Sequence, residues 1–187
     1  RQHARKIAMA GMRRRQPLQD QADEGMKVRL GIDIDKDMKV TAFLDQENHK
    51  VDIVGGGSLN LQTDNQGEFI MNGTYDIISG KVDYKLPILP MVKTFDINSS
   101  SLVNWTGSEP SDPEINIVAS EEVKATVNTD NKTSLVNFIV TIAITGTLEN
   151  LHITFDCSAA NNSTINSGIA SLDDDERSKV ALILLIS

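Results

Sequence analysis

Few residues of this 187-residue chain have the types and spacing that metal binding or catalysis requires. The stretch 33–37, DIDKD, begins like a calcium-binding loop, in which alternate carboxylates surround the ion. Such a loop needs Gly at its sixth position and Glu at its twelfth, but Met38 and Leu44 stand there. The stretch is therefore predicted to be a solvent-exposed turn and not a metal site.

Histidine and cysteine offer no clearer site. His3, His49 and His152 lie far apart in the sequence and form no metal-binding spacing. Cys157 is the single cysteine, so it has no disulfide partner within the chain, and no neighbouring His and Asp mark it as a nucleophile. The GGG at 55–57 lacks the Lys and Ser/Thr of a phosphate-binding loop. We predict that the protein is not an enzyme and binds no metal or other cofactor.

The charge of the chain argues against a nucleic-acid partner. The formal net charge is −8, whereas proteins that bind phosphates carry clustered Lys and Arg. Residues 1–25 are the exception, because they hold six basic residues before the sign of the charge changes at Asp20. We expect this segment to be a basic lead-in that is helical or disordered.

No targeting or membrane-spanning segment is evident in the sequence. The basic start is not followed by the apolar region of a signal peptide. No apolar run reaches the 18 residues of a membrane-spanning helix. Because the chain opens on Arg1 and ends within the apolar run KVALILLIS, we expect it to be a truncated piece of a longer protein.

The elements that would position a functional surface are strands. Apolar residues occupy every second position from Met26 to Ile34 and again from Met38 to Leu44, which is the period of a strand with one buried face. The same period recurs as far as Phe155, and 72–84 is interpreted as a tight hairpin. Roughly eleven strands at short, even spacing, with short connections, predict an antiparallel all-β domain over 26–157. The predicted turns lie at 55–57, 63–67, 79–80, 128–133 and 145–150.

The C-terminal part, 158–187, is predicted to contain a polar loop and then a helix. Acidic residues from Asp173 to Glu176 suit the positive end of a helix, and Ser171 is a candidate N-cap. We expect this helix to begin near 172 and to pack over the end of the sheet. The single tryptophan, Trp105, lies in the irregular stretch 99–113 and is interpreted as a packed turn residue.

Three architectures could bury the apolar face of these strands, namely a sandwich, a closed barrel, and an open sheet that curls around its own face. Composition alone does not choose among them. The chain has, however, an ordered set of motifs. They are GSLNL (57–61), TDNQGEFIMNGTYDIISGKVDY (63–84), FDI (95–97), NWTGSEPSDPEINIVAS (104–120), VNFIVTIAITGTLENLHITFD (136–156) and DDDERSKVALILL (173–185).

In this order the motifs resemble the C-terminal β-domain of the TamB family, which belongs to the AsmA-like, bridge-like lipid-transfer proteins. The resemblance covers about residues 26–187. Three positions depart from the family pattern: Ser99 replaces a usual Gly, Val82 replaces a usual Tyr, and the turn after Trp105 is stretched to GSEPSDP. These departures concern turn geometry.

The resemblance implies a long, curled, antiparallel-rich sheet with an apolar concave groove and short helices at the N- and C-terminal ends. Because alternate residues share one face, the strand periodicity assigns the residues that would line this groove. They are Val28, Leu30, Ile32, Ile34, Leu59, Leu61, Phe69, Met71, Tyr75, Ile77, Val82, Tyr84, Phe95, Ile97, Ile115, Ile117, Phe138, Val140, Ile142, Ile144, Ile153 and Phe155.

The function implied by the resemblance is transport of phospholipid between the inner and outer membranes of a diderm bacterium, with a role in outer-membrane biogenesis. The expected partners are phospholipid acyl chains, an Omp85-type outer-membrane barrel (TamA-like), and the inner membrane, reached through an N-terminal part outside this sequence. The expected location is the periplasm.

Two alternatives stay open at this point. One is a scaffold for the translocation or assembly of outer-membrane proteins. The other is a β-sandwich that serves as an adhesin or a carbohydrate-binding module.

Overall fold

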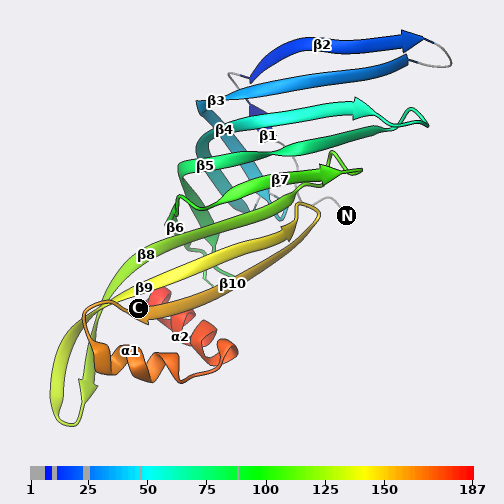
Figure 1. The fold of residues 1–187 in the computed structure, drawn as a ribbon. Helices are drawn as coiled ribbons and strands as arrows, with labels where there is room; N and C mark the ends of the chain where they lie inside the picture. The colour runs from blue at the N-terminus through cyan, green and yellow to red at the C-terminus, as the bar shows by residue number, and fades with distance from the viewer. Residues whose placement is uncertain (1–6, 10–11, 23–25, 47, 88) are drawn as a thin grey trace.

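The computed structural model of the chain describes residues 7–9, 12–22, 26–46, 48–87 and 89–187, with side-chain burial given for 27–46, 48–87 and 89–187. These residues form ten strands in one sheet and two helices (Figure 1). The strands are β1 (Ile7–Met9), β2 (Met12–Ala22), β3 (Met26–Leu44), β4 (His49–Thr63), β5 (Phe69–Lys85), β6 (Val92–Ile97), β7 (Leu102–Gly107), β8 (Glu114–Thr129), β9 (Lys132–Thr147) and β10 (Asn150–Ala159). The helices are α1 (Ser163–Ala170) and α2 (Asp174–Ile186).

Every strand pair in the sheet is antiparallel. The main order is β1-β3-β4-β5-β6-β8-β9-β10, while β2 also pairs with β3, and β7 joins β5 to β8. Neighbours in the sheet are mostly neighbours in sequence, because short turns connect strands that run in opposite directions. The predicted all-β, antiparallel architecture is confirmed.

The long strands are bent across a common line, so that the sheet folds back on itself (Figure 1). Residues 71–76 of β5 pair with β7, whereas residues 81–85 of the same strand pair with β6. We define the first layer as 26–34, 57–63, 69–77 and β7. The second layer is 38–44, 49–54, 79–85 and β6. The apolar side chains of the two layers face each other.

Register shifts mark the fold line. Ile34 pairs with Gly57 and Met38 with Gly55, so three residues of β3 bulge out between two positions of β4. On the other side of β4, Gly55 pairs with Ile77 and Val54 with Ser79, which leaves Ile78 as an extra residue. Bulges bend a strand and increase its twist, so they supply the curvature that the fold needs.

Glycine is required where β4 crosses the fold line. A Cβ atom on Gly55 would lie 2.0 Å from the carbonyl oxygen of Asp76, and one on Gly57 would lie 1.9 Å from that of Thr74. Neither distance is compatible with a side chain. The glycines therefore allow β4 and β5 to approach closely at the bend.

Several predicted turns are wrong for this reason. The GGG at 55–57 lies inside β4, and 79–80 lies inside β5, so 72–84 is one bent strand and not a tight hairpin. Trp105 is packed, as predicted, but it stands on strand β7 opposite Gly73 and not in a turn, and its indole N–H donates to the Pro110 carbonyl oxygen at 3.0 Å. The predicted solvent-exposed turn at 33–37 is also wrong, since these residues belong to β3.

The helix expected within residues 1–25 is also wrong over the described positions, which form β1 and β2. Residues 1–6, 10–11 and 23–25 of that segment lie outside the described part of the chain. β2 pairs with the first half of β3 and β1 with its second half, so both layers continue toward the N-terminal side.

The C-terminal helix is confirmed, with corrections to its surroundings. The predicted polar loop contains α1, whose N-cap Asn162 accepts a hydrogen bond from Ile165 N–H at 3.0 Å. The N-cap of α2 is Asp173 and not Ser171, because Asp173 and Glu176 form a reciprocal capping box. Ser171 instead ends α1.

Candidate functional site: the apolar interior of the folded sheet

Most of the residues assigned to the groove lie in the interior between and beside the two layers. They form one continuous cluster of predominantly apolar side chains. Those that are buried are Ile34, Leu59, Tyr75, Ile77, Val82, Phe95, Ile97, Ile115, Ile117, Phe138, Val140, Ile142 and Ile144. Those that are partly buried against this cluster are Ile32, Met71, Tyr84, Ile153 and Phe155.

The remaining assigned residues occupy one end of the sheet, at the start of β3, the end of β4 and the start of β5. Leu30 pairs with Leu61 and Leu61 with Met71, so the three side chains form a row across adjacent strands. Leu30, Leu61 and Val28 are half-buried, and Phe69 is 53% exposed. We call Val28, Leu30, Leu61, Phe69 and Met71 the open end.

Between the layers lies a small apolar cavity of about 40 Å³. The second layer and the strand ends next to it contribute Val40, Ala42, Leu44, Val51 and Ile53, while the opposite wall consists of Tyr75, Val103, Trp105, Pro113, Ile115, Ile117 and Leu148. Such a volume holds about one water-sized group. The interior is therefore packed by its own side chains, and a hydrocarbon chain would enter only if the layers separated.

Aromatic contacts join the edge strand β10 to the second layer. The ring of Phe155 on β10 lies 5.1 Å from that of Tyr84 on β5, edge to face, and 6.4 Å from that of Phe95 on β6. The imidazole of His49 stacks on Tyr84 at 4.3 Å. Because β10 is far from β5 in the strand order, these contacts cross the interior and close it on that side.

The polar groups inside are few and neutral. Burial lowers the pKa of His49, opposed by Asp45, and its Nδ1 accepts a hydrogen bond from the Lys85 N–H at 3.1 Å. Burial also raises the pKa of Tyr75 to about 12, and its hydroxyl donates to the Met38 carbonyl oxygen at 3.3 Å. These residues satisfy their polar atoms within the fold and place no charge in the apolar interior.

A family model identifies the protein family to which this folded sheet belongs. The model described as the TamB C-terminal domain matches residues 2–185, nearly the whole chain. The chain belongs to the TamB family. No match was found among curated proteins or among solved structures.

Membership of the TamB family carries a coarse function. TamB proteins are envelope proteins that act without catalysis in outer-membrane assembly and work with TamA-type partners. In the described part of this chain, no helix has both the length and the apolar character needed to cross a bilayer.

In this TamB domain, helix α2 covers the inner face where the sheet ends. The helix contacts β8, β9 and β10, and it buries Ala181, Leu184 and Leu185. Cys157 points inward from β10, and its Sγ lies 3.7 Å from the Arg177 carbonyl oxygen. Burial raises the pKa of this thiol, which disfavours the reactive thiolate.

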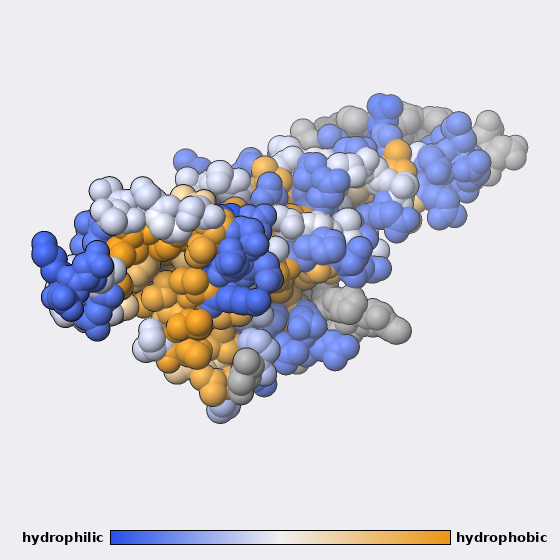
Figure 2. Space-filling view, turned by 90° about the horizontal axis from the view of Figure 1, so that it is seen from below, coloured by the Kyte–Doolittle hydropathy of each residue, from blue (hydrophilic) through white to orange (hydrophobic). Residues whose placement is uncertain are grey.

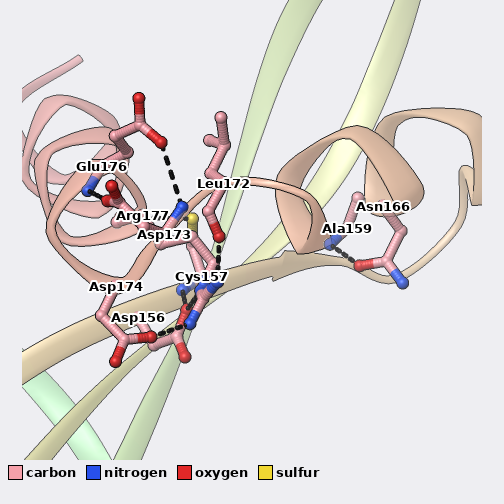
Figure 3. Close-up of polar contacts among 9 residues, drawn as sticks. All are labelled: Asp156, Cys157, Ala159, Asn166, Leu172, Asp173, Asp174, Glu176 and Arg177. Carbon is pink, nitrogen blue, oxygen red and sulfur yellow. Dashed lines mark hydrogen bonds and ion pairs between the residues drawn. The ribbon is translucent and has the colours of Figure 1, made fainter.

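Arg177 fixes the start of α2 against the edge strand (Figure 3). Its Nε donates to Asp156 Oδ1 at 2.9 Å, its Nη1 donates to the Leu172 carbonyl oxygen at 2.5 Å, and its Nη2 pairs with Asp174. Nearby, the side chain of Asn166 accepts from the Ala159 N–H at 3.0 Å. These contacts hold the two helices against β10 at the C-terminal end of the interior.

Part of the buried interior lies outside the set of groove residues predicted from the sequence. The omitted buried residues of the sheet include Met38, Val40, Leu44, Val51, Ile53, Ala119, Val136 and Leu148. Alternation was visible at Met38, Val40 and Leu44. It was hidden at Val51 and Ile53, because GGG at 55–57 was interpreted as a turn that ended the strand run.

The candidate metal-binding residues do not form a cluster in the described part of the TamB domain. Among the described residues, no group of three or more His, Cys, Asp and Glu side chains could hold a metal ion. The acids of 33–37 lie along one bulged strand, and His49 and His152 lie on different strands, β4 and β10. The apolar interior is thus the candidate functional site.

Proposed function

We propose that this TamB domain carries phospholipid between the inner and outer membranes, with acyl chains lying along the apolar inner face. The observation that supports the proposal is the continuity of this face, from the half-exposed open end into the interior. A phospholipid with ~30 chain methylenes avoids roughly 24 kcal/mol of exposure to water on such a surface, at about 0.8 kcal/mol per methylene. Specificity for the headgroup is low, because the inner face has few polar groups.

Entry begins at the open end. Leu30, Leu61 and Met71 already form an incompletely covered apolar row, so a chain that lies there displaces water and no protein side chain. Passage further inward requires the layers to part, since the cavity between them is only about 40 Å³. The contact of Phe155 with Tyr84 is the aromatic closure that would open in that movement.

The domain acts, in this proposal, as a periplasmic segment of a protein anchored in the inner membrane. Its net charge of −8 and its polar outer strand positions suit an aqueous compartment. The acyl chains stay inside the fold, while the headgroups remain in water at the open side.

Site-specific photo-crosslinking tests the proposal. Crosslinkers at Leu30, Leu61 and Ile117 are expected to capture phospholipid, whereas crosslinkers at Lys27 and Asp76 are not. The control positions lie on the same strands or on their neighbours, with side chains on the opposite face. Equal capture from both faces would contradict the proposal, as would native mass spectrometry without co-purified lipid.

The edge strand supports a second candidate function, the docking of an outer-membrane barrel of the TamA type. β10 ends the sheet and pairs only with β9 among the described strands. The N–H groups of Cys157 and Ala159 are taken by the side chains of Asp156 and Asn166. Residues 150–155 are therefore the part of this edge that a partner strand could extend.

Crosslinking also tests this second function. A photo-crosslinker at Thr154 on β10 is expected to capture the barrel partner. One at Thr145 on β9, opposite His152 and one strand further in, is the control. Equal capture at both positions, or none at Thr154, would remove strand addition at β10.

A further inference from the structure

The connection between β5 and β6 ends in exposed apolar side chains. Leu89, Met91 and Val92 are 39%, 38% and 57% exposed, and we call these three residues the apolar tip. Eight large hydrophobic residues are exposed among those whose burial is described, and three of the eight fall within the four consecutive positions 89–92. Such clustering distinguishes the tip from the scattered exposed side chains that any surface carries.

The nearest charged residue in the sequence on each side of the apolar tip is a lysine. The sequence from Leu86 to Val92 contains no charged residue, and Lys85 and Lys93 flank it. The two lysines stand at adjacent positions of the hairpin base, because Lys85 pairs with Val92 and Tyr84 with Lys93. An apolar tip above a pair of cations matches the layered chemistry of an anionic membrane surface.

The backbone of this connection is suited to an apolar environment. Pro87 and Pro90 have no N–H group. The Leu86 N–H donates to the Met91 carbonyl oxygen at 2.9 Å, and the Met91 N–H donates to that of Leu89 at 2.7 Å. Among the described residues of this connection, few backbone donors would therefore lose water without a partner if the tip entered hydrocarbon. Leu86 is buried and anchors the base, so the tip is held on the folded sheet.

We propose that the apolar tip inserts into the surface of an anionic phospholipid bilayer, with Lys85 and Lys93 contacting the headgroups. Figure 2 shows apolar surface gathered on the underside of the molecule, which gives the domain a face suited to a membrane. The inserted side chains carry the affinity, since the net charge of −8 opposes long-range attraction to anionic lipid.

Vesicle co-flotation of the folded domain tests the proposal. The probe is vesicles of phosphatidylcholine with about 30% phosphatidylglycerol, compared with phosphatidylcholine alone. Leu89→Asp combined with Val92→Asp is expected to weaken binding by about tenfold or more, because two carboxylates cannot enter the hydrocarbon. Ile78→Asp is the matched control, since Ile78 is 51% exposed on β5, the strand that precedes the apolar tip, but lies at the fold line.

The lysines are tested separately. Lys85→Gln combined with Lys93→Gln is expected to abolish the preference for anionic vesicles while keeping binding to phosphatidylcholine. Equal weakening by Ile78→Asp, or unchanged binding of the Leu89→Asp and Val92→Asp variant, would overturn the proposal. Thermal unfolding confirms that each variant is folded.

Insertion itself is measured with a polarity-sensitive fluorophore. The label is placed at Leu89→Cys in a Cys157→Ala background and, as a control, at Ile78→Cys. A blue shift on vesicle addition at position 89 and not at 78 is expected, whereas no shift at 89 overturns the proposal. The result is independent of lipid carriage, because vesicle binding at the tip and lipid capture at Leu61 are separate measurements.

Discussion

The two ends of the inner face have the same sequence pattern and opposite exposure. On β9, Val136, Val140 and Ile142 are completely buried. At the open end, Leu30 and Leu61 are half-buried and Phe69 is 53% exposed. All six are apolar residues at alternate positions along their strands, so the local pattern does not distinguish them.

The difference arises from what covers each end. Near β9 and β10, helix α2 packs on the sheet, and the ring of Phe155 reaches Tyr84 in the second layer. The open end has no such cover among the described residues. Alternation therefore selects which face of a strand is apolar. Contacts between segments distant in the sequence decide whether this face is sealed or remains accessible to a ligand.

The largest expected effect comes from a carboxylate placed at each end. Ile142→Asp is expected to lower the free energy of unfolding by about 4 kcal/mol or more, because the interior offers the charge no partner. Leu30→Asp is expected to cost about 1–2 kcal/mol, because its side chain can reach water. Urea denaturation of the two variants measures the difference. Equal costs would remove the distinction between a sealed and an open end.

The next largest effect on stability is expected at the fold line, where the sheet bends to bring its two layers together. Gly57→Ala is expected to cost about 3 kcal/mol, since the new Cβ would collide with the backbone of β5. Gly67→Ala is the control. It has a φ of +83° but nothing within 4 Å of the new Cβ, so only backbone strain of about 1 kcal/mol is expected. Thermal unfolding that ranks the two variants in the reverse order would show that the bend tolerates a side chain.

Truncation of one phenylalanine at each end tests the same difference in burial between the two ends. Phe155→Ala is expected to cost about 2 kcal/mol, because it removes the ring that bridges β10 to Tyr84 and Phe95. Phe69→Ala is expected to cost less than about 1 kcal/mol because half of that side chain is already in water. Hydrogen exchange at β10 should rise only in Phe155→Ala. A rise in both variants would contradict the bridging role.

The smallest expected effect is a pH dependence of stability that arises from His49, which stacks on Tyr84 in the second layer. Burial lowers the pKa of His49 from its ordinary value of 6.5, so the unfolded chain binds the proton more readily than the folded protein. The contribution of neutral His49 to the free energy of unfolding is fully present above pH 6.5. It is lost as the pH falls toward the lower pKa that His49 has in the folded protein.

Urea midpoints at about pH 5 and about pH 7 test this dependence. The drop between them should shrink in His49→Phe, which keeps a ring on Tyr84 but does not titrate. An unaltered drop in His49→Phe would assign the pH dependence to other groups.

Much of the fold was predictable from local pattern. The alternation from Met26 to Ile34 predicted a strand with one apolar face, and the acids from Asp173 to Glu176 predicted a helix start; both are confirmed. The resemblance to the TamB family is confirmed over residues 2–185. Contact of the inner face with lipid stays a prediction.

The errors cluster at the bend. GGG at 55–57 and Ser79–Gly80 have the residue types of turns, and nothing local distinguishes a turn from a glycine that admits a neighbouring strand. The distinction lies in Asp76 and Thr74, whose carbonyl oxygens occupy the space of the missing side chains. Basic residues near the N-terminus likewise suggested a helix, but pairing with β3 made 12–22 a strand.

The sequence by itself determined the period of two, the choice of apolar face and the turns at 63–67, 128–133 and 145–150, because these depend on neighbouring residues. Only the tertiary structure decided where the sheet bends, which strands meet across the interior, and which apolar residues stay accessible. These properties depend on contacts such as Tyr84 with Phe155, between residues far apart in the chain that no local pattern relates.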